Sequence, residues 1–158
     1  MIVIESSVLF DQPRWLELRR SLWPTAERAT LLAEMKEQLA HPERYAPFLA
    51  YAIADDGRRS AIGFAEASLR YEYVNGARHL QAPDIPAAFL EGLYVVPTHR
   101  HAGVARQLVR AVIRWARSHG CHELLSDVML ENISGQKVHE ALGFEETERV
   151  VFFRQDIQ

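Results

Sequence analysis

Residues 98–105 combine basic side chains with a glycine at the expected start of a helix. The segment reads Thr98-His99-Arg100-His101-Ala102-Gly103-Val104-Ala105 and follows an apolar run that ends at Pro97. Main-chain N–H groups at a helix N-terminus carry partial positive charge, and a glycine lets a ligand approach the backbone closely. Arg100 and the two histidines can add positive charge. This pattern indicates the binding of a pyrophosphate group.

The spacing Arg100-x-x-Gly103-x-Ala105 differs from two common phosphate-binding patterns. It has neither the Gly-Lys-Ser/Thr ending of a P-loop nor the three glycines of a dinucleotide-binding fold. On its own it also fits an ordinary turn from a strand to a helix. The neighbouring elements must therefore decide between these interpretations.

Two acidic residues occupy positions that are unusual for solvated acids. Glu91 lies within an otherwise apolar strand, and Asp127 follows Leu124 and Leu125 near the expected end of another strand. Carboxylates at such positions can bind a cationic amine and draw a proton from it through water. The alternatives are a strand edge that faces water for Glu91 and a turn or helix-cap acid for Asp127.

Three other chemistries fail on spacing. His99-x-His101 lacks the further ligands of a metal site, so we expect no metal. Cys121 has no positioned base and follows a helix C-terminus, which disfavours a thiolate. Ser126-Asp127 lacks the nucleophile elbow of a serine hydrolase.

Hydrophobic periodicity and turn residues predict a mixed α/β domain with helices that flank a sheet. The predicted helices are Asp11–Trp23, Ala26–Leu39, Gly103–His119 and Asn132–Leu142. The predicted strands are Met1–Ser6, Phe48–Ala54, Ser60–Tyr71, Phe89–Val96, Glu123–Met129, Phe144–Arg149 and Val150–Gln155. Asp55-Asp56-Gly57 predicts a hairpin, and Gly63 predicts a bulge or close packing. The strands on either side of Gly103–His119 should be parallel neighbours.

Composition limits the class of protein. The chain has 158 residues, which predicts one domain over 1–158, and 48% of them are hydrophobic. It has no apolar run long enough to span a membrane and no visible secretory signal. A single cysteine fits a reducing compartment, so we expect a cytoplasmic protein. The net charge of −3 argues against nucleic-acid binding.

The order of these elements, with the loop Arg100-x-x-Gly103-x-Ala105, resembles the GCN5-related N-acetyltransferases and their acetyl-CoA loop. Further blocks resemble the aminoglycoside 6′-N-acetyltransferases within that superfamily: Leu18–Pro24, Tyr73–Gly76, Phe89–Gly92, Gln136–His139 and Ala141–Arg149. The last block is the most specific, because the fold does not require its Glu-rich run. The resemblance implies the acetyltransferase fold, a homodimer, and acetyl transfer from acetyl-CoA to the 6′-amine of an aminoglycoside.

The resemblance also assigns residues. It places antibiotic contacts on Trp23, Tyr73, Glu91, Asp127 and Glu148. It places acetyl-CoA contacts on Leu93, Tyr94, Val95, Arg100, His101, Ala102, Gly103, Val104, Ala105 and Asn132. Core packing is the alternative for Trp23 and Tyr73, and a plain surface charge is the alternative for Glu148.

Acetyl transfer needs a neutral amine, a polarised thioester carbonyl and a proton for the departing thiolate. Glu91 and Asp127 would serve the amine, and strand amides near Tyr94 would bond the thioester oxygen. Many members of the superfamily have a proton-donating Tyr where this chain has His139. His139 can donate a proton or be a structural histidine. A thiol pKa of about 8.5 also makes the thiolate a tolerable leaving group without a dedicated acid.

Two departures from the resembled family bear on the choice of acceptor. Some members have a histidine shortly after the Trp-Pro pair, where this chain has Thr25-Ala26. The loop Ala77–Pro86 is also longer than usual. The open alternatives are an acetyltransferase for a polyamine, another amino sugar or a protein amine, and a CoA-binding module without turnover.

Overall fold

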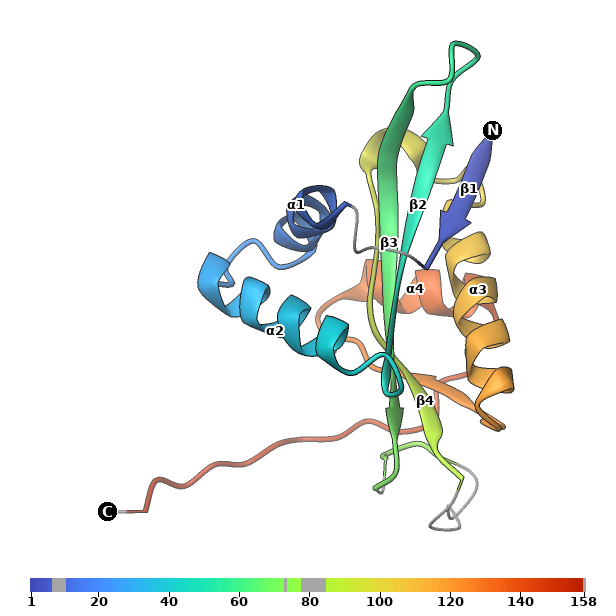
Figure 1. The fold of residues 1–158 in the computed structure, drawn as a ribbon. Coiled ribbons are helices and arrows are strands. Elements are labelled where there is room, and N and C mark those ends of the chain that lie inside the picture. The colour runs from blue at the N-terminus through green and yellow to red at the C-terminus, as the bar shows by residue number, and fades with distance from the viewer. Residues whose placement is uncertain (7–10, 73, 78–84, 158) are drawn as a thin grey trace. The chain divides into compact units, whose positions relative to one another are not determined.

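The computed structural model describes residues 1–158 except residues 7–10, 73, 78–84 and 158. Figure 1 shows its ribbon. The chain divides into two compact units, Met1–Asp127 and Val128–Gln158. The first unit contains β1 (Ile2–Glu5), α1 (Gln12–Leu22), α2 (Arg28–Ala40), β2 (Tyr45–Ile53), β3 (Arg59–Arg70), β4 (Ala87–Val95), the 3-10 turn η2 (Pro97–His99), α3 (Val104–Ser118) and β5 (Leu124–Ser126). The second contains α4 (Ile133–Leu142). The expected single domain over 1–158 stays a prediction.

The five strands in the described part of the chain form one sheet in the order β1-β2-β3-β4-β5. The first four strands are antiparallel neighbours, and β4 pairs with β5 in parallel through the α3 crossover. The predicted hairpin is present, because β2 and β3 meet at a turn in which Gly57 has a φ of 82°. The mixed α/β class and the crossover are therefore confirmed.

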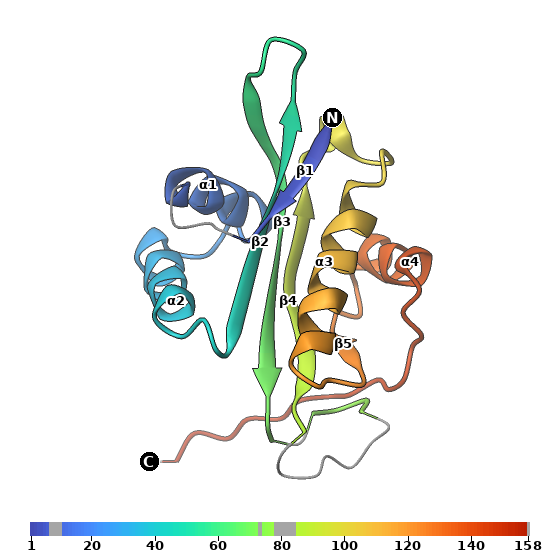
Figure 2. The same cartoon turned by 45° about the vertical axis from the view of Figure 1, so that its right-hand side comes forward.

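Helices cover both faces of this sheet (Figure 2). α1 and α2 lie over one face, and α3 lies over the other. Trp15 of α1, Met35 of α2 and Phe64 of β3 belong to one buried core on the first face. Leu108 and Val112 of α3 are fully buried. Because β3 is covered on both faces, its sequence is mostly apolar rather than alternating.

Two irregularities in strand pairing shape the sheet. Opposite β2, the register shifts beside Gly63, where a Cβ atom would lie 2.6 Å from the carbonyl oxygen of Tyr94. This confirms the prediction of a bulge or close packing at Gly63. Between β3 and β4, Glu66 lies opposite Gly92 and Ala67 opposite Leu90, which leaves Glu91 without a partner. Glu91 is therefore the extra residue of a β-bulge.

In the second unit, α4 begins at Asn132, whose Oδ1 accepts a hydrogen bond of 2.8 Å from the N–H of Gly135. It ends at Gly143, which has a φ of 94°. Residues 144–157 form no helix or strand. The prediction of closing strands over Phe144–Arg149 and Val150–Gln155 is therefore wrong for this structure, and β5 is shorter than predicted. Residue types favour a strand locally, but a strand also needs a hydrogen-bonded neighbour, which a sequence pattern does not supply.

Candidate active site

The loop between β4 and α3 presents main-chain amides around an open space. His101 and Gly103 have φ values of 61° and 77°, so the backbone turns sharply twice before α3 begins. Gly103 is the N-cap and offers no side-chain cap to the first-turn amides, such as those of Val104 and Ala105. A Cβ atom at Gly103 would find nothing within 4 Å. This geometry suits a pyrophosphate bound by main-chain N–H groups.

Arg100 contacts the strand that precedes it, and its predicted contact with acetyl-CoA stays a prediction. Its Nε donates a hydrogen bond of 3.0 Å to the carbonyl oxygen of Val95. Its guanidinium carbon lies 5.8 Å from the ring centroid of Tyr94. The side chain therefore folds back onto β4 and ties the loop to the strand that precedes it.

One edge of β4 becomes available at its C-terminal half. Among the described residues, β5 pairs with β4 only from Ala88 to Leu90. Beyond Leu90 the same edge of β4 runs on through Leu93, Tyr94 and Val95, while its other edge stays paired with β3. Backbone groups on an unpaired edge can bond a ligand that lies along it. The predicted thioester-binding part of β4 therefore has an edge that no strand among the described residues pairs with.

The two predicted acids are neighbours at the point where β4 and β5 stop pairing. Leu90 lies opposite Ser126, Glu91 is the next residue of β4, and Asp127 directly follows the end of β5. Phe89 and Leu125, each two residues before one of these acids, pack in one cluster. Asp127 is exposed. The structure therefore brings the backbones of Glu91 and Asp127 together at the end of the β4–β5 pairing.

Glu91 already has a cationic partner in this structure. Nη2 of Arg70 lies 2.9 and 3.0 Å from its two carboxylate oxygens. The hydroxyl of Ser68 donates a bond of 2.5 Å to Oε1. The guanidinium carbon of Arg70 also lies 3.5 Å from the ring centroid of Phe89. A cationic ligand of Glu91 must therefore share the carboxylate with Arg70 or displace it.

Sequence reasoning missed Ser68 and Arg70. The signal was present, because Glu66, Ser68 and Arg70 are polar residues at alternate positions near the end of β3, and the residues between them are apolar. Alternation places all three side chains on one face of the sheet. Burying polar side chains costs free energy unless they find polar partners. A row of polar residues in a strand that is covered on both faces therefore indicates a polar site on that face.

Of the two aromatic residues predicted to contact the antibiotic, the structure describes Trp23. Trp23 is half-buried at the end of α1, and a Cβ atom on Gly92 would lie 2.7 Å from its Cη2. The indole therefore rests on the β4 bulge, one residue from Glu91. Tyr73 lies outside the described residues.

The remaining predicted residues belong to the second unit. Asn132 caps α4 as described above. Nδ1 of His139 lies 2.8 Å from the carbonyl oxygen of Gly135, and its ring lies 5.1 Å from that of Phe144. Because a carbonyl oxygen only accepts, Nδ1 carries a proton. Glu148 is exposed in the segment after α4. The roles of these three residues stay predictions.

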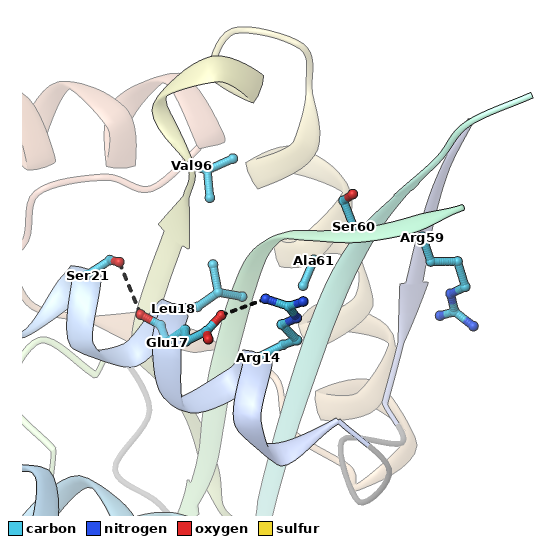
Figure 3. A pocket seen from close by; sticks show the side chains of 8 residues that line it. All are labelled: Arg14, Glu17, Leu18, Ser21, Arg59, Ser60, Ala61 and Val96. Carbon is cyan, nitrogen blue, oxygen red and sulfur yellow. Dashed lines mark hydrogen bonds and ion pairs between the residues drawn. The ribbon is translucent and has the colours of Figure 1, made fainter. Parts of the chain in front are cut away.

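A separate pocket of about 300 Å³ lies beside α1 (Figure 3). It is lined by Arg14, Glu17, Leu18, Ser21, Arg59, Ser60, Ala61 and Val96. Arg14 and Glu17 form an ion pair of 3.0 Å at its rim, and Arg59 pairs with Glu5 at 2.8 Å. None of the predicted site residues lines this pocket, so we do not assign the reaction to it.

No group of three or more His, Cys, Asp or Glu side chains in the described part of the chain could hold a metal ion. Within those same residues, no helix is both long enough and apolar enough to cross a membrane.

Comparisons with known proteins identify the family. Residues 13–144 match the acetyltransferase (GNAT) family. The aminoglycoside N(6′)-acetyltransferase type 1 of Salmonella typhimurium is 48% identical over 140 residues, which cover 89% of each chain.

Solved structures agree. AAC(6′)-Iy in complex with the bisubstrate analog CoA-S-monomethyl-acetylneamine superposes with a TM-score of 0.87 at 44% identity and covers 99% of both chains. The aminoglycoside 6′-N-acetyltransferase AAC(6′)-Ih from Acinetobacter baumannii gives a TM-score of 0.86 at 40% identity and covers 100% of both. The chain therefore belongs to the acetyltransferase (GNAT) family, among the acetyl-CoA-dependent enzymes named aminoglycoside N(6′)-acetyltransferase type 1.

Proposed function

We propose that this protein transfers the acetyl group of acetyl-CoA to the 6′-amine of an aminoglycoside antibiotic. The proposal is supported above all by the acids Glu91 and Asp127, which directly follow Leu90 and Ser126, the last paired residues of β4 and β5. The amide-lined loop at Gly103 begins a few residues further along the same chain. The names of relatives at 40–48% identity support the same acceptor.

The proposed reaction is a direct attack within a ternary complex. The first-turn amides of α3, including those of Val104 and Ala105, hold the pyrophosphate, and the pantetheine arm follows the free edge of β4. A strand amide near Tyr94 bonds the thioester oxygen as negative charge develops there. The amine nitrogen attacks the carbonyl carbon, the C–S bond breaks, and the electron pair leaves with sulfur as CoA thiolate. A relative bound to a bisubstrate analog fits a pathway in which both substrates are present together.

Protons move at both ends of this reaction. Asp127 and Glu91 bind the ammonium form and take its proton through water, which frees the nitrogen lone pair. The thiolate needs a proton at the end of the step. His139 is the predicted donor, but its Nδ1 is held by Gly135, which leaves Nε2 as an acceptor in the neutral ring. That contact favours the structural alternative for His139, with solvent as the proton source.

On the acceptor side, Trp23 and Tyr73 would stack on sugar rings while Glu148 binds a further amine. Aromatic faces with polar edges suit sugars, which have both apolar faces and hydroxyl rims. Asn132 would contact acetyl-CoA. These assignments come from the resemblance and belong to the proposal.

The proposal includes a homodimer of single-domain chains. Val151, Phe152 and Phe153 are 75%, 86% and 93% exposed in the segment after α4. An apolar run with that exposure is expected to be covered in the functional assembly. A second copy of this chain is the occupant we propose, and truncation before Val150 should yield monomers in sedimentation. We also propose a cytoplasmic location, with neither nucleic acid nor membrane as a partner.

The direct test is the release of CoA thiol by purified protein with kanamycin or tobramycin. An aminoglycoside with a hydroxyl at the 6′ position is the matched control and should give no release. Absence of turnover with every 6′-amino aminoglycoside would refute the proposal. Turnover with spermidine or a histone peptide alone would select another acceptor class, and tight acetyl-CoA binding without any turnover would indicate a binding module.

A further inference from the structure

A cluster of buried polar side chains lies between the sheet and its two N-terminal helices, and the proposed reaction does not use it. Glu66 of β3 is 1% exposed, and Arg19 of α1 is 2% exposed. Oε1 of Glu66 accepts a bond of 2.7 Å from Nε1 of Trp15, and Oε2 accepts one of 2.9 Å from Nε2 of Gln38. Nε of Arg19 lies 2.8 Å from Oε1 in ionic contact, although its geometry falls outside that of a hydrogen bond.

Stability alone is a poor reason for this cluster. Burial raises the pKa of the Glu66 carboxyl, while the charge of Arg19 opposes the shift. The buried Oε1 of Gln38 also has no hydrogen-bond partner among the described residues. Two apolar side chains of similar volume often replace a buried ion pair without loss of stability. The position of Arg19 within the cluster suggests another role, which is to hold a neighbouring side chain in place.

The cluster fixes the guanidinium of Arg19 from several directions. Nη1 donates a bond of 2.7 Å to the carbonyl oxygen of Leu31, and Nη2 donates one of 2.7 Å to Glu34. Both acceptors belong to α2, and Glu66 belongs to β3. Because these anchors lie on two different elements, the plane of the guanidinium has little freedom to turn.

Arg19 in turn packs against Trp23. Its guanidinium carbon lies 4.9 Å from the Trp23 ring centroid and 5.9 Å from that of Trp15. On another side, a Cβ atom at Gly92 would lie 2.7 Å from Cη2 of Trp23. The ring centroid of Phe64 lies 5.9 Å away. The indole is thus held between a fixed cation and the β4 bulge that carries Glu91.

We propose that Arg19, anchored by Glu66, is a positioning residue that fixes the Trp23 indole as a rigid wall of the acceptor site beside Glu91. This inference rests on the proposed function, because it takes Trp23 to contact the acceptor. Acetyl-CoA uses the loop and the free edge of β4, so the cluster should affect the acceptor and leave the cofactor alone. Glu66 touches neither substrate and acts through Arg19.

The main test is the pair of substitutions Arg19→Met and Glu66→Met in one protein, which removes both charges and keeps similar volume. We expect the KM for the aminoglycoside to rise about tenfold, the size of a lost cation–π contact. The kcat should change less, and the Kd for CoA should stay within about twofold. Arg20→Met, an exposed arginine next in the helix, is the matched control and should leave all three constants unchanged.

Gly92→Ala tests the same wall from its other side. The added methyl group would displace the indole, so we expect the same rise in the KM for the aminoglycoside. The melting temperature should fall less in Gly92→Ala than in Arg19→Met alone. Arg19→Lys keeps the charge but loses the planar stack, and it should move KM in the same direction. If the double variant fails to fold, Gly92→Ala and Arg19→Lys provide the test. A wild-type KM for the aminoglycoside in both variants would overturn the inference.

Trp23→Ala separates the inference from the proposed function. A raised acceptor KM in Trp23→Ala with wild-type KM in the folded double variant would show that Arg19 does not position the indole. An unchanged KM in Trp23→Ala would show that the indole does not form part of the acceptor site, which would overturn the inference. The proposed function would still stand if the wild-type protein acetylates an aminoglycoside.

Discussion

The two halves of the proposed site recognise their substrates with different parts of the chain. The loop around Gly103 offers main-chain amides, and its arginine folds back onto β4. The acceptor half offers side chains: Glu91, Asp127, Arg70 and Trp23. Main-chain recognition depends on backbone conformation, whereas side-chain recognition depends on charge and shape. Acceptor preference should therefore change by substitution without loss of acetyl-CoA binding.

The largest effect should come from the acceptor half. We expect Asp127→Asn to lower kcat/KM for the aminoglycoside about 100-fold or more, because the amine loses a cation partner and a route for its proton. The Kd for CoA, measured by calorimetry, should stay within about twofold. Glu123→Gln, an acid next to the other end of β5, is the control. If Asp127→Asn weakens CoA binding as strongly as it lowers kcat/KM for the aminoglycoside, Asp127 has a structural role instead.

The cofactor half can be broken by backbone conformation. Gly103 has a φ of 77°, and a β-branched residue there costs about 1–2 kcal/mol. A valine side chain would also enter the space proposed for phosphate. We expect Gly103→Val to weaken CoA binding about tenfold or more and to leave acceptor specificity unchanged.

Gly57→Val is a matched control for that strain. Gly57 has a φ of 82°, and a Cβ atom added there, as at Gly103, would find nothing within 4 Å. It should lose similar stability in urea unfolding yet bind CoA as the wild-type protein does. Equal weakening of CoA binding in both variants would mean that strain, and not phosphate contact, explains the Gly103 result.

Substitution of Arg70 should have a smaller effect, which is to lower the KM for the aminoglycoside. Nη2 of Arg70 already contacts Glu91, and both side chains are about one-third exposed. Arg70→Met should free the carboxylate for the acceptor and lower its KM about two- to fivefold, the scale of a partly exposed ion pair. Arg59→Met, in the same strand and paired with Glu5, should leave KM unchanged. A raised KM in Arg70→Met would instead mean that Arg70 orients Glu91.

The smallest effect should come from His101. Its φ of 61° is unusual for a residue with a side chain, and glycine relieves that strain while adding freedom to the unfolded chain. We expect His101→Gly to change the free energy of unfolding by less than about 1 kcal/mol and to leave CoA binding intact. A large loss of CoA affinity would show that the imidazole itself contacts the cofactor.

Sequence reasoning found the local features of the fold and the pairs that strand topology brings together. The helix after Gly103, the hairpin at Gly57 and the adjacency of Glu91 and Asp127 follow from residue pattern and the parallel crossover. It missed the Arg70 contact and the Glu66 cluster, because both join elements far apart in the chain. It also predicted strands after residue 143 where the residue types favour a strand but no neighbour pairs with it.

The central claim is that one aminoglycoside amine lies between Glu91 and Asp127 while main-chain amides hold acetyl-CoA. A crystal structure of the protein with CoA and tobramycin tests it most directly. We predict the pyrophosphate on the amides of residues 103–105 and the 6′-nitrogen within hydrogen-bond distance of Glu91 or Asp127. A 6′-nitrogen located elsewhere, for example in the pocket beside α1, would contradict the account.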